Sequence, residues 1–62
     1  MKVREVIEML ESEGWEIDRM VGSHRQFWKR GARRPITVPG KPSDDMKIGT
    51  LKSILRQMKA GR

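Results

Sequence analysis

The chain contains no cysteine and no tyrosine, and it has a single histidine. Without cysteine, neither a disulfide nor a thiolate metal site can stabilise the fold, and this composition fits a reducing compartment. No apolar run approaches the roughly 18 residues that a membrane span needs. We also find no secretory signal at the start of the chain. The sequence therefore predicts a cytoplasmic protein without membrane association.

The length of 62 residues leaves room for one small hydrophobic core. A chain of this size buries only about 60% of the surface that its unfolded form exposes. We therefore expect a single domain over residues 1–62 that is stabilised by regular, well-packed elements.

Acidic residues are scarce in most of the chain, although they are frequent at its start. Fourteen Lys and Arg against eight Asp and Glu give a net charge of +6. Residues 1–18 contain six acids and two bases, whereas residues 19–62 contain twelve bases and two acids. Such an asymmetric field attracts polyanions, so nucleic acid is the leading candidate partner. A basic face that merely contacts solvent is the alternative.

Two segments have apolar residues at helical spacing. We expect helices over residues 2–14 and 50–59, with Gly14 ending the first and Thr50 capping the second. The periodicity assigns both apolar stripes to the core. They consist of Val3, Val6, Ile7 and Leu10 in the first helix, and Leu51, Ile54, Leu55 and Met58 in the second.

The middle of the chain alternates in the manner of β-strands. We expect strands over residues 15–20, 24–30 and 34–39, the first two joined by a turn at 21–23. Pro35 indicates an edge strand or a strand start. The order α-β-β-β-α predicts an α+β fold in which two helices cover one face of a three-stranded antiparallel sheet. The other face is left open.

Phe27 and Trp28 are adjacent in the second predicted strand. Their side chains must point to opposite faces of the sheet, so only one of them belongs to the core. The pattern leaves open which one it is. The exposed ring would be available to stack on a nucleic-acid base, which contributes about 1–3 kcal/mol. We expect Trp28 to contact RNA.

His24 follows a predicted turn at Gly22 and Ser23. An imidazole can both donate and accept a proton near neutral pH. RNA cleavage needs a base for the attacking 2′-hydroxyl, an acid for the leaving oxygen and cations around the phosphate, and it requires no metal. A lone histidine in a basic strand can equally donate a hydrogen bond to phosphate without catalysing anything. The pattern also leaves the second proton-transfer group open.

Basic residues surround this histidine in the sequence, and we expect them to hold the RNA backbone. Asp44 and Asp45 occur in a Pro-rich loop, where they are expected to contact solvent or form a turn. We therefore predict no metal site. A solvated hairpin tip is the alternative for residues 29–34. The predicted RNA contacts are Arg25, Lys29, Arg30, Arg33, Arg34 and Lys41.

Four stretches in this order resemble the HicA family, the small toxin ribonucleases of HicA–HicB toxin–antitoxin pairs. They are EGW at 13–15, GSHRQF at 22–27, ITVPGKP at 36–42 and IGTLKSILRQ at 48–57. The resemblance extends over nearly all of the chain. The tail MKAGR departs from the usual glycine-leucine ending of the family, which places the last turn of the helix in question.

The resemblance implies a fold related to double-stranded RNA-binding domains. It also implies metal-independent and cofactor-independent cleavage of mRNA, which inhibits translation and growth as part of a stress response. His24 matches the active-site histidine of the family and Gly22 matches a glycine of the same motif. A HicB-like antitoxin would neutralise the toxin. A non-catalytic RNA-binding module with the same fold is the alternative.

Overall fold

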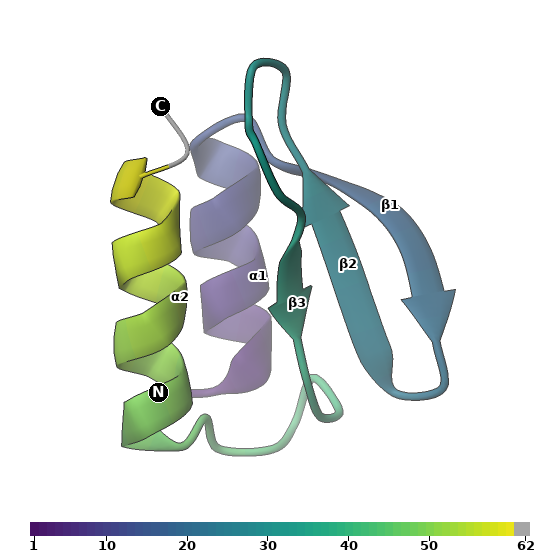
Figure 1. Ribbon diagram of the computed structural model, residues 1–62. Helices are drawn as coiled ribbons and strands as arrows, with labels where there is room; N and C mark the ends of the chain where they lie inside the picture. The colour runs from purple at the N-terminus through teal and green to yellow at the C-terminus, as the bar shows by residue number, and fades with distance from the viewer. Residues whose placement is uncertain (61–62) are drawn as a thin grey trace.

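The computed structural model describes residues 1–60, and Figure 1 shows its five elements. Their order confirms the predicted α-β-β-β-α arrangement and the α+β class. The three strands form one antiparallel sheet in the order β1-β2-β3. Residues 61–62 of the predicted domain lie outside the described residues. The elements are α1 (Val3–Ser12), β1 (Glu16–Val21), β2 (His24–Trp28), β3 (Ile36–Val38) and α2 (Ile48–Ala60).

One hydrophobic core lies between the helices and the sheet. The two helices lie side by side next to β3, and β1 is the strand farthest from them (Figure 1). Every residue of β1 is exposed, because the helices do not reach it. Ile17 illustrates this point, since it is paired with the buried Phe27 and is still 52% exposed. The core residues are Val3, Val6, Leu10, Trp15, Phe27, Ile36, Val38, Met46 and Ile54.

Gly14 ends α1 as the sequence predicts, with a φ of 93°. Its N–H donates to the Glu11 carbonyl at 3.0 Å, and the Trp15 N–H donates to the Leu10 carbonyl at 3.0 Å. These two bonds form a Schellman motif, which satisfies carbonyls that the helix end would leave free. Trp15 and Leu10 are both buried, and an apolar contact between these two positions often accompanies the motif. The turn thereby sends the chain back into β1.

The start and the face of α2 differ from two of our predictions. The helix begins at Ile48, and the Lys47 carbonyl accepts the Leu51 N–H at 2.9 Å. Thr50 therefore lies inside the first turn, so its prediction as the N-cap is wrong. Leu55 is 40% exposed, so its assignment to the core is also wrong. Ile54 is buried, whereas Leu55 is rotated by about 100° from it around the helix axis.

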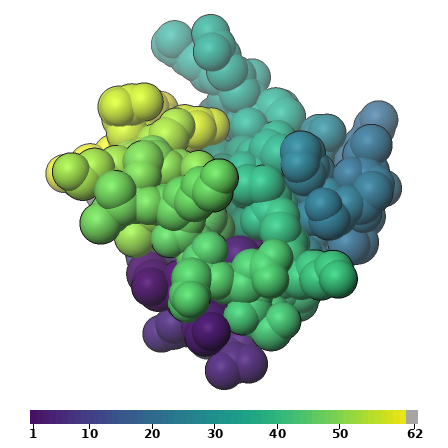
Figure 2. Space-filling model, turned by 90° about the horizontal axis from the view of Figure 1, so that it is seen from below, coloured from purple at the N-terminus to yellow at the C-terminus, as the bar shows by residue number. Residues whose placement is uncertain are grey.

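The loop between β3 and α2 is tied to the start of α1. The Asp44 carboxylate accepts the Lys41 backbone N–H at 3.0 Å, which confirms the turn-forming role predicted for this residue. The Asp44 carbonyl accepts the Val3 N–H at 2.9 Å, and the Asp45 carboxylate lies 3.3 Å from the Lys2 ammonium. Figure 2 shows the loop and the N-terminus together on the lower face. These contacts hold the loop at one end of the sheet.

No helix within residues 1–60 is long and apolar enough to cross a bilayer.

Candidate functional site

His24 is the first residue of β2 and is paired with Val21 across a two-residue turn. Gly22 has a φ of 61°, and Ser23 does not have a positive φ. This combination of signs is that of a type II′ turn, whose twist suits a β-hairpin and which places glycine first. The imidazole is exposed, and it makes no hydrogen bond or ion pair with another residue of the described chain. His24 therefore has a fixed backbone position and a free side chain.

Alternation along β2 places three side chains on the open face of the sheet. His24, Gln26 and Trp28 point away from the helices, because the intervening Phe27 is buried in the core. Phe27 is 1% exposed and Trp28 is 43% exposed, so the exposed ring of the pair is that of Trp28. The open face thus offers an imidazole, an amide and an indole along one strand.

Two hollows meet at Trp28. One of about 420 Å³ lies over the open face, and a second of about 430 Å³ extends towards the hairpin tip. The first is lined by Asp18, Arg19, Gln26, Trp28 and Pro35. The second is lined by Gly14, Glu16, Ile17, Asp18, Trp28, Lys29 and Arg30. The indole therefore lies between a polar depression on the sheet and two cations of the loop, although Glu16 and Asp18 also border this region.

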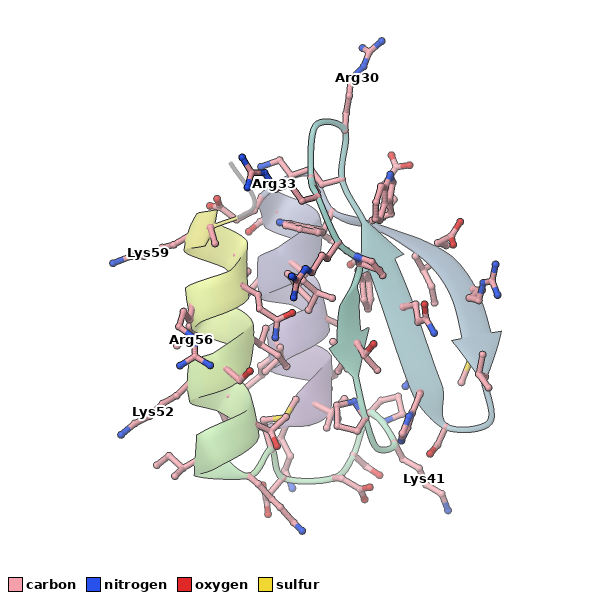
Figure 3. All side chains as sticks on the ribbon, in the orientation of Figure 1. Arg30, Arg33, Lys41, Lys52, Arg56 and Lys59 are labelled. Atoms are coloured by element: carbon pink, nitrogen blue, oxygen red, sulfur yellow. The ribbon has the colours of Figure 1, made fainter. Side chains whose placement is uncertain are left out.

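The structure separates His24 from most of the basic residues that are near it in sequence. His24 begins β2, whereas the loop over 29–34 follows the end of that strand. Four extended residues span about 13 Å, so these cations lie at the opposite end of the sheet from the imidazole. Figure 3 shows Arg30 at the outer tip of this loop. The separated residues are Lys29, Arg30, Arg33 and Arg34.

Arg25 and Lys41 lie at the same end of the sheet as His24. Arg25 is paired with Val38 and faces the helix side, where one guanidinium N–H (Nη1) donates to the Gly40 carbonyl at 3.0 Å. This contact fixes the segment that presents Lys41, whose exposed side chain extends from that end in Figure 3. The structure thus gives Arg25 a positioning contact on the face opposite to that of His24. Its predicted contact with RNA stays a prediction.

Sequence reasoning did not single out Gln26, Arg19 or Thr37, which share the open face with His24. Gln26 was detectable, because it lies two residues from both His24 and Trp28 in an alternating strand. Arg19 was not detectable, because an irregularity between Ile17 and Arg19 shifts the register of β1. Such a bulge reverses the expected face of every following residue. Within residues 1–60 no group of three potential metal ligands is found.

A family model described as the HicA toxin of bacterial toxin–antitoxin systems matches residues 3–60. The chain belongs to the HicA toxin family. The match includes both helices, the whole sheet, the Gly22–Ser23 turn and His24. It confirms the resemblance found in the sequence and assigns the chain to the toxin side of toxin–antitoxin systems. A comparison with curated proteins finds no match.

Proposed function

We propose that this HicA-family chain is a metal-independent endoribonuclease that acts in the cytoplasm, cleaves mRNA and thereby inhibits translation and growth. The observation that supports the proposal most strongly is the position of His24. Its exposed, unpartnered imidazole begins a strand directly after a glycine-dependent turn, within a chain whose family is a toxin family. A proton-transfer group needs this combination of access and fixed direction.

The proposed reaction uses the RNA's own nucleophile. The 2′-oxygen forms a bond to the adjacent phosphorus, and the bond from phosphorus to the 5′-oxygen breaks. A base accepts the proton of the 2′-hydroxyl, and an acid donates one to the departing 5′-oxygen. The products are a 2′,3′-cyclic phosphate and a 5′-hydroxyl. His24 performs one of these two proton transfers, and Lys41 supplies positive charge to the phosphate from the same end of the sheet.

The RNA is proposed to lie along β2. Trp28 stacks on a base about 13 Å from His24, and Gln26 between them donates to a base or a sugar. Beyond Trp28 the loop cations bind the phosphate backbone, which adds affinity without sequence information. Ser23 at the turn is proposed to donate a hydrogen bond to the phosphate beside His24. The loop cations are Lys29, Arg30, Arg33 and Arg34.

A HicB-like antitoxin is the proposed protein partner. To neutralise this chain it must exclude RNA from His24. It also needs acidic residues to match the excess of positive charge in the sequence of residues 19–62, which contains twelve bases and two acids.

The test is cleavage of RNA by the purified chain in the presence of EDTA. We expect cleavage that leaves 2′,3′-cyclic phosphate ends, and we expect His24→Ala to abolish it. His24 is exposed, so its replacement leaves the core intact. Ile48→Ala, an exposed residue of α2 far from the open face of the sheet, is the matched control and should cleave like the original chain. Intact RNA after long incubation with folded, antitoxin-free protein would instead support the non-catalytic RNA-binding module.

A further inference from the structure

The outer face of α2 has three cations and no acid. Lys52, Arg56 and Lys59 are the only charged residues of this helix. Their spacing of four and then three residues places them within about 60° of one another around the helix axis. All three are exposed, and none forms an ion pair with another residue in 1–60. Figure 3 shows their side chains extending from α2 away from the sheet.

Helix stability does not explain this arrangement. Lys52 and Arg56 are four residues apart, and like charges at that spacing destabilise a helix. Lys59 lies in the last turn, where the helix dipole favours a cation, but Lys52 lies in the half of α2 nearer the N-terminus, where the dipole does not. A solvated helix face usually mixes charges of both signs. The three like charges therefore lower the stability of α2, and binding of an anionic ligand would explain their presence.

Loop cations extend the same surface. A hollow of about 300 Å³ beside α2 is lined by Arg33, Arg34, Ile36, Gln57 and Ala60. Gln57 lies next to Arg56 in the helix, on the flank that faces the loop. Figure 3 shows Arg33 at the same end of the molecule as Lys59. We call the surface formed by Lys52, Arg56, Lys59, Arg33 and Arg34 the α2 ridge.

We propose that the α2 ridge binds the phosphate backbone of single-stranded RNA, at a distance from His24. The nature of this ligand rests on the proposed function. Successive cations of α2 are separated by about 6 Å and 4.5 Å along the helix axis, so a regularly charged polymer can contact all three. No aromatic residue lies on the ridge, so it offers phosphate contacts and no stacking.

RNA fits the ridge better than an acidic protein does. The ridge ends in the loop at Arg33 and Arg34, and the same loop begins at Lys29 and Arg30 beside Trp28. One strand of RNA can therefore continue from the open face of the sheet around the loop and onto α2. The groove that holds the exposed Leu55 with Met9 and Met58 adjoins the ridge, because Arg56 and Lys59 also line it, and Glu13 borders it. Arg33 and Arg34 lie outside that groove, so RNA is favoured by the continuity of the ridge with the loop.

The test compares two double variants that each remove two positive charges. The ridge variant is Lys52→Gln/Arg56→Gln, and the control is Arg4→Gln/Lys47→Gln, whose residues are exposed and lie outside both proposed RNA surfaces. Glutamine is a good helix former, so both variants should fold. Both are made with His24→Ala, so that affinity is measured without cleavage. Fluorescence anisotropy of a labelled single-stranded RNA of about 16 nucleotides gives the Kd at several salt concentrations.

We expect the ridge variant to bind RNA roughly tenfold more weakly at low salt, with the control unchanged. Its plot of log K against log salt should be shallower by about 1.4, which is 0.7 for each lost phosphate contact. Equal affinity and slope in both variants would overturn the proposal. Weaker binding of poly-glutamate by the ridge variant, with RNA binding unchanged, would assign the ridge to an acidic protein and would also overturn it.

The loop double variant Arg33→Gln/Arg34→Gln provides a second measurement that leaves α2 untouched. It should weaken RNA binding and flatten the salt dependence in the same way, and no effect would contradict the continuity of the ridge. Neither measurement depends on catalysis. Absence of cleavage by the unsubstituted chain would contradict the proposed function. The binding data would still show whether the α2 ridge binds RNA.

Discussion

Gly22 is the residue on which the placement of His24 depends most directly. Its φ of 61° is strained for any residue with a Cβ, although a Cβ there would meet no atom within 4 Å. The cost of Gly22→Ala is therefore conformational, and we expect it to lower the free energy of unfolding by about 1–2 kcal/mol. Urea unfolding of the purified variant measures this loss.

Gly49→Ala is the matched control for this prediction. Gly49 also has open space around its Cα, but it lies inside α2 without a positive φ. Alanine should stabilise the chain there by about 0.5 kcal/mol. A Gly22→Ala variant as stable as the original chain would show that the turn does not hold His24 in the way described.

Substitutions of Phe27 and Trp28 are predicted to have different effects, the first on stability and the second on RNA binding. Phe27 is 1% exposed, so Phe27→Ala should cost about 3–5 kcal/mol of unfolding free energy. Trp28 is 43% exposed, and Trp28→Ala should weaken RNA binding by about 1–3 kcal/mol with a much smaller loss of stability. Thermal unfolding and RNA titration of both variants measure the two effects. Unchanged RNA affinity of the Trp28→Ala variant would show that the indole does not contact RNA.

Residues whose backbone conformation requires a particular amino acid were predictable from the sequence. Gly14 and Gly22 lie at positive φ because each ends or turns an element. The choice between Phe27 and Trp28 was not predictable, because strand alternation has two solutions and only the helix layer decides between them. The grouping of His24 with the loop cations was misleading, since residues that are close in a strand sequence are carried apart by about 3.3 Å each.

Among the elements, α2 shows the clearest conflict between local stability and charge. Lys52→Glu should remove the repulsion from Arg56 and create an attractive pair four residues apart. We expect it to raise the free energy of unfolding by about 0.5 kcal/mol, and Lys52→Gln should give a smaller gain. The same substitutions should weaken RNA binding. Thermal unfolding at low salt measures the gain, and destabilisation by either variant would mean that Lys52 has a structural role.

The boundaries of α2 show how far periodicity predicts an element. The apolar spacing placed a helix at 50–59, close to the observed Ile48–Ala60. Its continuation to Ala60 also shows that the unusual tail does not shorten the helix before that residue. Periodicity identifies an apolar stripe, but the packing partner decides how much of the stripe is covered. In this fold Leu51, Ile54 and Met58 pack in or against the hydrophobic core, whereas Leu55 lies in a surface groove.

In the molecule as a whole, the proposed site of RNA cleavage and the proposed site of additional RNA binding lie at opposite ends of β2. His24 and Lys41 are at one end of β2, and Trp28 with the loop cations is at the other. A dinucleotide reaches only the first end. We therefore expect its kcat/KM to be at least about tenfold lower than that of an RNA of about 16 nucleotides, since contacts remote from the reacting phosphate stabilise the transition state. Steady-state kinetics with the two substrates measure the ratio, and equal values would contradict the separation.

The proposed cleavage of RNA depends on proton transfer by the imidazole of His24. The most direct test measures cleavage by His24→Ala in EDTA, with and without added imidazole. Loss of the side chain leaves open space at an exposed position, so free imidazole can enter and replace it. If His24 transfers the proton, His24→Ala should be inactive alone and should regain part of its activity as imidazole is added. Cleavage by folded His24→Ala at the rate of the original chain would contradict it.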